Sequence, residues 1–361
     1  MKAAILHEPK RPMTIEEVEL RKPGRQEVLV RTVAAGLCHS DLHFIDGTYP
    51  GPVPCILGHE AAGVVEQVGE DVTGLKPGDH VISCLSVFCG ECECCVTGHM
   101  SLCTNTAVKM PPGAAQRITW KGQHVAQFMN LSSFAEMMLV HQHALVKIRE
   151  DMPLDKACLI GCSVMTGYGA VAHTADVSPG QSVAVFGVGG IGLSAIQSAR
   201  LAGAARIFAV DIDPSKKALA EEFGATDFVD ASAGDPAEQL MDAAGDGVDH
   251  AFECVGLKVT AEQAFRSLRS RGTATLIGLF PPTQSLEFNG FSFFRERRVQ
   301  GSNMGSNHFP VDMPRLVEFY MQDRLKLDEM VSKTITLEQI NEGFDALAKG
   351  GIARNVILFD Q

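Results

Sequence analysis

Hydrophobic and polar positions change their period about halfway along the chain. Up to about residue 163, apolar and β-branched runs such as EVLVRTVAAG, AAGVVEQVG and HVISCL alternate with turn signals such as Lys76-Pro77-Gly78-Asp79. Runs of this kind, bounded by glycine and proline, are typical of antiparallel strands. The first part of the chain is therefore expected to form a β-rich domain with long loops.

After about residue 164, strand-like and helical patterns alternate. The expected strands cover 182–187, 205–211, 226–230, 248–256 and 273–280, and the expected helices cover 191–202, 214–223, 236–244 and 259–269. This alternation predicts βαβ units and a doubly wound parallel sheet, an α/β fold. From about residue 304, two helical patterns near 312–323 and 337–348 precede the strand-like run NVILF.

Composition narrows the class of protein. The 361 residues are 45% hydrophobic and 20% charged, as in ordinary globular proteins. A net charge of −12 argues against nucleic acid as a partner. Apolar runs do not reach transmembrane length, and the start MKAAILHEPKRP lacks the apolar stretch of a signal peptide. We therefore expect no membrane association and a cytoplasmic location, where thiols stay reduced.

Four cysteines have the spacing of a metal site. Cys89, Cys92, Cys95 and Cys103 follow the pattern C-x2-C-x2-C-x7-C. Four thiolates surround one Zn²⁺ tetrahedrally, and short spacers let one loop supply all of them. The sequence therefore predicts a structural zinc, with Cys94 as a competing thiol. The alternative is a loop of reduced thiols or a regulatory disulfide.

A glycine-rich turn predicts dinucleotide binding. Gly187-Val188-Gly189-Gly190-Ile191-Gly192 satisfies G-x-G-x-x-G, follows an apolar strand and opens a predicted helix, and Asp211 ends the next strand. In this context Gly187 allows the tight turn, Gly189 lets the backbone approach a pyrophosphate, and Gly192 permits close packing. Asp211 favours NAD over NADP, because a carboxylate repels a 2′-phosphate. The alternative is a glycine-rich turn without a ligand.

Three further segments carry a family resemblance. They are GLCHSDLH with Cys38, GHEAAGVVEQVG with His59, and GCSVMTGYGAV with Cys162. With the cysteine cluster and the glycine turn, the chain resembles the zinc-dependent medium-chain alcohol dehydrogenases from residue 1 to about 358. The resemblance implies a GroES-like catalytic domain over 1–163 and 304–361, with a structural-zinc lobe near 89–103. It also implies a Rossmann NAD-binding domain over 164–303.

The resemblance also implies roles for individual residues. Cys38, His59 and Cys162 are expected to hold a catalytic zinc, with Asp41 and Glu60 as carboxylates that orient the ligands. Ser40 starts a proton relay that passes through the nicotinamide ribose to His43 and solvent. The implied coenzyme contacts, besides the glycine turn and Asp211, are His39, Thr166, Ile191, Lys216 and Arg354.

The expected activity is reversible oxidation of primary or secondary alcohols to aldehydes or ketones, with hydride transfer to NAD⁺ and two Zn²⁺ per chain. Tyr49 and Leu85 match pocket-lining positions and favour hydrophobic or aromatic alcohols. The long segment 104–130 resembles that of dimeric members and predicts a homodimer.

Two alternatives remain open. One is a formaldehyde dehydrogenase acting on S-(hydroxymethyl)thiol adducts of the glutathione or mycothiol type, for which Arg117 and Lys121 are the candidate carboxylate anchors. The other is a non-catalytic dinucleotide-binding protein, such as a redox sensor. Such a protein would lack Cys38, His59 and Cys162.

Overall fold

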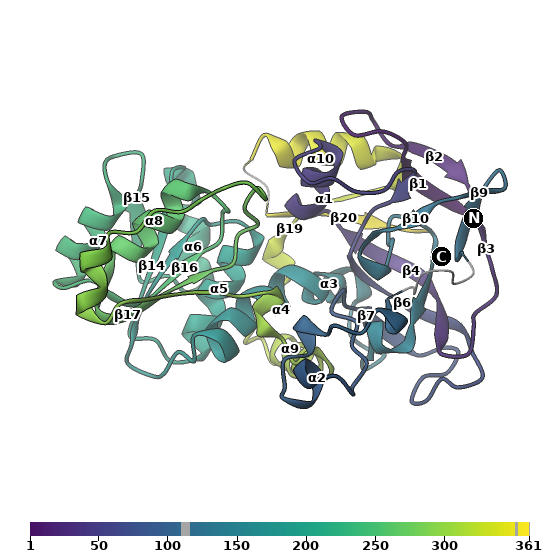
Figure 1. Cartoon of the computed structure of the whole chain (residues 1–361), viewed down its shortest axis with the longest axis horizontal. Helices are drawn as coiled ribbons and strands as arrows, with labels where there is room; N and C mark the ends of the chain where they lie inside the picture. The colour runs from purple at the N-terminus through teal and green to yellow at the C-terminus, as the bar shows by residue number, and fades with distance from the viewer. Residues whose placement is uncertain (110–115, 351–352, 361) are drawn as a thin grey trace. The chain divides into compact units, whose positions relative to one another are not determined.

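A computed structural model describes residues 1–109, 116–350 and 353–360 (Figure 1). The chain divides into two compact units. Unit 1 comprises Met1–Cys162 and His308–Gln361, and unit 2 comprises Ser163–Asn307. The sequence predicts these two boundaries at 163/164 and 303/304. Residues 110–115 of the long segment 104–130 lie outside the described residues.

Unit 1 is built from mostly antiparallel strands. Its largest sheet runs in the order β12-β7-β6-β4-β20-β19, and β11 also pairs with β4. The strands of this sheet are β4 (Glu27–Gly36), β6 (Glu60–Val68), β7 (His80–Ser83), β11 (Met137–His141), β12 (Leu145–Lys147), β19 (Val331–Ile335) and β20 (Arg354–Leu358). Along β4 the buried positions come mainly at every second residue, because successive side chains point to opposite faces of a strand.

Two smaller sheets complete the β structure of unit 1. One has the order β10-β5-β1-β2 and the other the order β3-β8-β9. Their strands are β1 (Lys2–Leu6), β2 (Thr14–Glu17), β5 (Cys55–Ile56), β10 (Ala126–Gln127), β3 (Glu19–Leu20), β8 (Ile118–Trp120) and β9 (Gln123–His124). Fully buried side chains from these strands and their loops, including Ile5, Ile56 and Phe134, form one apolar core with Val28 of β4.

Short helices of unit 1 lie close to the residues predicted to bind metal. They are α1 (His39–Ile45), α2 (Glu93–Val96) and α3 (Leu154–Leu159), and the longer helices of the unit are α9 (Phe309–Met321) and α10 (Ile340–Ala348). Cys38 immediately precedes α1, Cys92 immediately precedes α2, and Cys162 follows α3 by three residues. Among the residues that the structure describes, no helix has the length and apolarity to cross a membrane.

Unit 2 is a parallel six-stranded sheet with helices packed against it (Figure 1). The order β15-β14-β13-β16-β17-β18 reverses between β13 and β16, which confirms the predicted Rossmann arrangement. The strands are β13 (Ser182–Phe186), β14 (Arg206–Asp211), β15 (Asp227–Asp230), β16 (Val248–Glu253), β17 (Leu268–Leu276) and β18 (Arg298–Gly301). The helices are α4 (Met165–Gly169), α5 (Gly190–Leu201), α6 (Lys217–Phe223), α7 (Pro236–Ala244) and α8 (Lys258–Arg266).

The last two strands of this sheet correct the sequence analysis. The strand predicted over 273–280 is β17, which begins at Leu268 and ends at Leu276, so the helix before it ends at Arg266. The sixth strand, β18, was not predicted. It pairs only with β17 at the edge of the sheet, and none of its four residues is fully buried. An edge strand of this kind needs no apolar run, so the hydrophobic pattern gives no signal for it.

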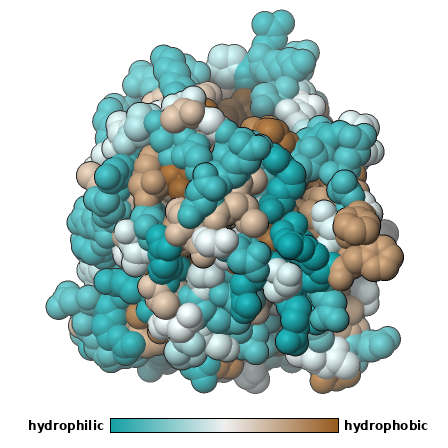
Figure 2. Space-filling model, turned by 90° about the vertical axis from the view of Figure 1, so that its left-hand side faces the viewer, coloured by the Kyte–Doolittle hydropathy of each residue, from teal (hydrophilic) through white to brown (hydrophobic). Residues whose placement is uncertain are grey.

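Most of the surface shown in Figure 2 is hydrophilic, and hydrophobic side chains gather at a few places on this face. Among the described residues, the most exposed large apolar side chains belong to the short helix Gly290–Arg295 that precedes β18. There, Phe291 is 79% exposed and Phe294 is 84% exposed, with their ring centroids 5.6 Å apart. Exposed phenyl rings beside an unpaired strand edge are typical of a protein interface.

Candidate metal centres and dinucleotide site

The cysteine cluster at 89–103 has the geometry of a tetrahedral metal site. The Sγ atoms of Cys92 and Cys95 lie 3.4 Å apart, and the pairs Cys92–Cys103 and Cys89–Cys95 are each separated by 3.9 Å. Two sulfur ligands about 2.3 Å from one Zn²⁺ stand about 3.8 Å apart at the tetrahedral angle. The four sulfurs therefore fit a single zinc ion. Cys94, the competing thiol, is not in the group of ligand atoms.

Backbone N–H groups point at these sulfurs and favour their ionised forms. The N–H groups of Glu91 and Cys92 donate to the Cys89 Sγ over 3.4 and 3.3 Å. Hydrogen bonds from the backbone of Thr104 and Cys95 lower the pKa of Cys92 to about 6. Burial and the neighbouring thiols raise the pKa of Cys95 to about 12. Four thiolates in one place therefore require the charge of a bound cation.

A second cluster joins three segments that are distant in the sequence. Cys38 stands between β4 and α1, His59 directly precedes β6, and Cys162 follows α3. The Sγ of Cys162 lies 3.3 Å from the Nε2 of His59, and all three side chains are at most 4% exposed. Their ligand atoms lie within 4.8 Å of one another and of a Glu60 oxygen. The structure thus brings together the three residues predicted to hold the catalytic zinc.

Asp41 fixes the orientation of the His59 ring. Its Oδ1 lies 3.1 Å from the Nδ1 of His59 and accepts the backbone N–H of Gly58 over 3.0 Å. This contact leaves Nε2 facing Cys162. Burial by itself lowers the pKa of His59, but the charges of Asp41 and Cys38 outweigh burial and raise it. A carboxylate on the far nitrogen of an imidazole is the usual support of a metal-binding histidine.

A buried ion pair borders the same cluster. The guanidinium of Arg354 donates to both carboxylate oxygens of Glu60 over 3.2 and 3.1 Å, and it lies 3.8 Å from the Sγ of Cys38. Burial raises the pKa of Glu60 to about 7, although Arg354 opposes the shift. A hydrogen bond from Cys162 and the charges of Arg354 and His59 lower the pKa of Cys38. This contact of Arg354 was not predicted from the sequence, and the predicted contact of Arg354 with a pyrophosphate stays a prediction.

Helix α1 carries the residues predicted for proton transfer. Ser40 and His43 are three residues apart, so they lie on one face of α1. The His43 side chain is 28% exposed, its Nδ1 is 3.8 Å from Asp46, and this nitrogen has no hydrogen-bond partner among the described residues. His39, the first residue of α1, is exposed.

Aromatic rings gather beside His59. The Phe128 ring centroid lies 5.9 Å from that of His59 and 4.6 Å from that of Phe44. Tyr49, predicted to line a pocket, stacks against Phe44 at 6.0 Å, and Leu85 is partly buried against the same apolar core. One side of the His59 cluster is therefore aromatic.

The glycine turn of unit 2 has the geometry of a phosphate-binding turn. Gly187 has φ +95°, which favours glycine. A Cβ on Gly192 would lie 1.7 Å from the carbonyl oxygen of Gly187, so α5 requires glycine there. A Cβ on Gly189 would meet nothing within 4 Å, so the protein itself does not require this glycine. That open space, at the start of α5, fits the close approach of a pyrophosphate.

Asp211 lies at the carboxyl end of β14, next to the glycine turn. Its Oδ2 accepts the N–H of Val188 over 2.7 Å and the ammonium of Lys216 over 3.0 Å. The structure thus brings together the predicted ribose-binding residues Asp211 and Lys216. Thr166 is buried in α4, where its Oγ1 donates to the Sδ of Met304 over 3.5 Å, and Ile191 lies in the first turn of α5.

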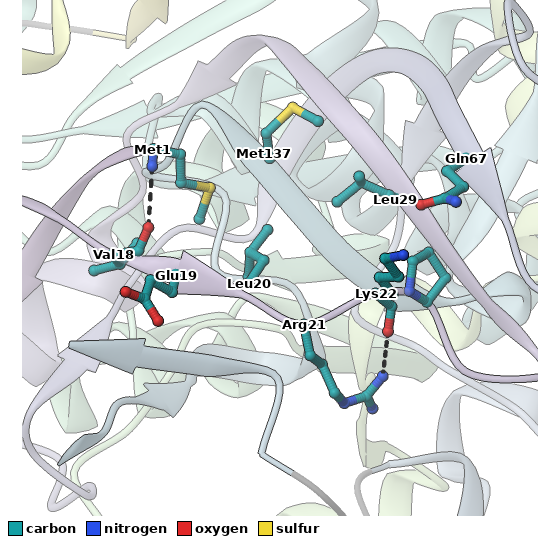
Figure 3. Close-up of a pocket in the computed structure, with 10 residues that line it drawn as sticks. Met1, Val18, Glu19, Leu20, Arg21, Lys22, Leu29, Gln67 and Met137 are labelled. Carbon is teal, nitrogen blue, oxygen red and sulfur yellow. Dashed lines mark hydrogen bonds between the residues drawn. The ribbon is translucent and has the colours of Figure 1, made fainter. Parts of the chain in front are cut away.

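A hollow of about 380 Å³ in unit 1 involves none of the predicted site residues (Figure 3). Its apolar part includes Met1, Leu20 and Met137, and Arg21 and Lys22 lie at its margin. The hollow therefore belongs to neither candidate metal centre.

Arg117 is not available as the carboxylate anchor considered for thiol adducts. Its side chain is 4% exposed, donates to Glu27 over 2.8 Å and donates to Gln127. Lys121, the other candidate anchor, is exposed and lies over the Trp120 ring at 4.2 Å. Of the two candidate anchors, only Lys121 is exposed, and its ammonium lies 3.9 Å from a carboxylate oxygen of Glu16.

Comparison with known proteins decides the family. Residues 24–150 match the alcohol dehydrogenase GroES-like domain, and residues 190–321 match the zinc-binding dehydrogenase family. The chain belongs to the zinc-dependent medium-chain alcohol dehydrogenase family. It is therefore an oxidoreductase that carries out zinc-dependent alcohol oxidation with a nicotinamide cofactor, as the sequence analysis predicted.

Individual relatives cover the whole chain. Alcohol dehydrogenase class-3 of Drosophila melanogaster is 40% identical over 99% of this chain and 97% of its own length. An alcohol dehydrogenase zinc-binding domain protein of Burkholderia ambifaria has a TM-score of 0.95 and 36% identity over 100% of this chain and 99% of that one. Benzyl alcohol dehydrogenase of Acinetobacter calcoaceticus has a TM-score of 0.93 and 31% identity over 99% of both chains. Similarity is thus not confined to one unit.

Proposed function

We propose that this dehydrogenase uses NAD(H) and binds two Zn²⁺ per chain, one at Cys38, His59 and Cys162 and one at the cysteine cluster 89–103. The observation that carries the proposal is the buried Cys₂His group with Asp41 behind the imidazole. Three protein ligands leave the fourth zinc position for a substrate oxygen, as in catalytic sites, whereas four thiolates complete a structural site. Metal analysis of the purified protein tests the count, with about two zinc per chain expected.

Cys38, His59 and Cys162 would hold the zinc ion, which when bound would act as a Lewis acid and lower the pKa of an alcohol oxygen. The chain contributes the acceptors for the released proton. Ser40, the hydroxyl of α1, would accept the alcohol proton while giving up its own, and His43 on the same face of α1 would release a proton to water at the far end of the relay. The partial exposure of the His43 side chain supports this role. His43→Gln should reduce alcohol oxidation mainly below neutral pH, and an unchanged pH–rate profile would remove His43 from the mechanism.

Asp211 supports NAD as the coenzyme. Its carboxylate is buried at the end of β14 and directed at the glycine turn, where a 2′-phosphate would meet negative charge. Asp211→Gly should raise kcat/KM with NADP⁺ relative to NAD⁺ by at least about tenfold, the effect of roughly 1.4 kcal/mol. Asp230→Gly is the matched control, because Asp230 ends the neighbouring strand β15. Equal turnover of the wild type with both coenzymes would overturn the assignment.

The aromatic rings beside His59 support hydrophobic or aromatic alcohols as substrates. A panel of short aliphatic, long-chain and aromatic alcohols with NAD⁺ tests this preference. The panel also includes formaldehyde with glutathione, which forms the thiol adduct of the alternative function. A kcat/KM that is highest for the thiol adduct would establish the alternative, and its carboxylate would then need an anchor other than Arg117.

We further propose a homodimer in the cytoplasm. The free edge of β18 and the exposed rings of Phe291 and Phe294 support pairing of two coenzyme-binding units edge to edge. Eleven free cysteines support a reducing compartment. Light scattering on wild type and Phe294→Asp measures the assembly, and a wild type with the mass of one chain contradicts the dimer.

A further inference from the structure

Glu253 is a buried carboxylate at the carboxyl end of β16, beside the point where the strand order reverses. Its side chain is 0% exposed, and its Oε1 accepts three hydrogen bonds. The donors are the N–H of Val255 at 2.9 Å, the N–H of Gly256 at 2.8 Å and the hydroxyl of Thr260 at 2.6 Å. Its Oε2 has no hydrogen-bond partner among the described residues. A buried acid of this kind is costly to keep and calls for a role beyond packing.

The backbone of Glu253 also holds the loop that follows β17. Its carbonyl oxygen accepts the N–H groups of Ile277 and Gly278 over 2.9 and 3.0 Å. A Cβ on Gly278 would lie 2.1 Å from the backbone nitrogen of Gly256 and 2.6 Å from the Oε2 of Glu253. The two loops that follow β16 and β17 therefore meet at Glu253, with no room for another side chain.

The same loop packs against the glycine turn. The N–H of Cys254 donates to the carbonyl oxygen of Phe186 over 3.0 Å. A Cβ on Gly187 would lie 2.6 Å from the Cγ2 of Val255, so the Val255 side chain lies directly against the first glycine of the turn. Val255 and Leu279 are nevertheless 41% and 38% exposed. They offer apolar surface at the edge of the sheet where doubly wound folds bind dinucleotides.

We propose that Glu253 is a positioning residue for the nicotinamide cofactor, because its carboxylate fixes loop 254–257 against the Gly187 turn. The loop is then held in its binding conformation before the cofactor arrives, and preorganisation of this kind increases affinity. Burial raises the pKa of Glu253, while the three donors oppose that shift and favour the ionised form. This inference rests on the proposed use of NAD(H).

The test compares the two ends of β16 in the zinc-loaded enzyme. Glu253→Ala should raise the dissociation constant for NADH, measured by fluorescence titration, by about tenfold, while kcat falls less than the KM for NAD⁺ rises. Glu253→Gln keeps a carbonyl oxygen for the three donors and should stay within about threefold of wild type. Thr260→Val removes one donor and should give a small increase.

Asp249 provides the matched control, because it lies near the amino end of β16, whereas Glu253 lies at the carboxyl end. It accepts the N–H and the hydroxyl of Ser182, each over 2.8 Å. Asp249→Ala should lower the thermal midpoint and leave the NADH dissociation constant unchanged. The inference would be overturned if Asp249→Ala and Glu253→Ala weakened NADH binding equally. It would also be overturned if Glu253→Ala bound NADH as tightly as the wild type does. Failure of the wild type to bind NADH would instead overturn the proposed function.

Discussion

The two candidate metal centres of unit 1 contrast in how the chain builds them. One takes all four ligands from residues 89–103, around the single turn of α2. The other takes Cys38, His59 and Cys162 from three segments that meet only in the folded unit. Short spacers close small loops at little entropic cost, so the first centre forms locally. The second depends on the sheet that carries β4 and β6.

The two metal centres also differ in their burial and in the polar groups that surround them. Cys89, Cys92 and Cys95 are partly exposed, and the nearby polar support consists of backbone N–H groups. The buried centre has charged side chains around it instead, with Asp41 behind His59 and the Glu60–Arg354 pair beside Cys38. A site with four thiolates has no free coordination position, while a Cys₂His site keeps one. This difference supports the proposal that the first centre stabilises the fold and the second carries the chemistry.

The largest expected effect comes from breaking the buried centre. Cys162→Ser should lower kcat/KM for alcohol oxidation by at least about a thousandfold, since Lewis-acid stabilisation is worth several kcal/mol. Metal analysis should show loss of one zinc per chain. Cys158→Ser is the control, because Cys158 is equally buried in α3 but outside the ligand group. Near-normal activity of Cys162→Ser would contradict the assignment.

Breaking the local centre should change stability instead. Cys103→Ser should also lose one zinc, and it should lower the unfolding free energy by about 3 kcal/mol or more, or roughly 4 °C in thermal midpoint for a chain of this length. Calorimetry measures the shift. The kcat of the folded fraction should stay within about twofold of wild type, because this centre does not touch substrate. A loss of kcat as large as that of Cys162→Ser would erase the contrast between the centres.

The Asp41 carboxylate behind His59 gives a test that affects the buried centre alone. Asp41→Asn keeps the size of the side chain but removes the charge that faces the Nδ1 of His59. Zinc affinity or activity of the buried centre should fall by about 10- to 100-fold. Competition with a chelator measures the affinity at this centre, and the cysteine cluster in the same sample is the internal control. Equal loss of zinc from both centres would point to general unfolding.

The stability of the fold in acid should depend on Glu27, which lies outside both metal centres. Burial opposes ionisation of Glu27, but hydrogen bonds from Arg21, Gly24 and Arg117 outweigh it and lower its pKa from 4.5 to about 2. A depressed carboxyl pKa stabilises the fold above the unfolded pKa, and that stability is lost as pH falls from about 4.5 through about 2. After a discount for the exposed part of the side chain, Glu27→Gln should cost about 2 kcal/mol at neutral pH.

Denaturant titrations of wild type and Glu27→Gln between neutral pH and pH 3 measure this contribution. The difference between the two proteins should shrink as the pH falls below about 4.5, because Glu27 of the unfolded chain then binds a proton while Glu27 of the folded protein, with a pKa of about 2, stays ionised. Zinc content at each pH separates this effect from loss of metal. A difference that grows with acid would contradict the assigned ion pair.

The smallest effect should come from the spare thiol. Cys94 lies within the cysteine lobe but outside the ligand group. Cys94→Ser should keep two zinc per chain and change the unfolding free energy by no more than about 0.5 kcal/mol. If Cys94→Ser lost zinc while Cys95→Ser retained it, Cys94 and not Cys95 would be the zinc ligand.

The sequence by itself determined the features that depend on short spacing. The C-x2-C-x2-C-x7-C run predicted the four sulfurs that the structure gathers, and G-x-G-x-x-G predicted the turn before α5. Strand–helix alternation predicted the parallel sheet of unit 2. These features are local, because the hydrophobic period, the loop lengths and the glycine positions that define them depend only on residues that are close in the sequence. Cys38, His59 and Cys162 were found through family resemblance, since their spacing alone carries no signal.

Only the tertiary structure decided which distant charges meet. It paired Arg354 with Glu60 beside Cys38, buried Arg117 against Glu27, and placed Glu253 between two loops. It also added β18, whose residues have no apolar pattern. Single arginines and glutamates read as surface residues in a sequence, and burial becomes favourable only when the fold supplies the opposite charge or the hydrogen-bond donors. The partners in the Arg354–Glu60 and Arg117–Glu27 pairs are 294 and 90 residues apart in the chain, so only the folded unit brings them together.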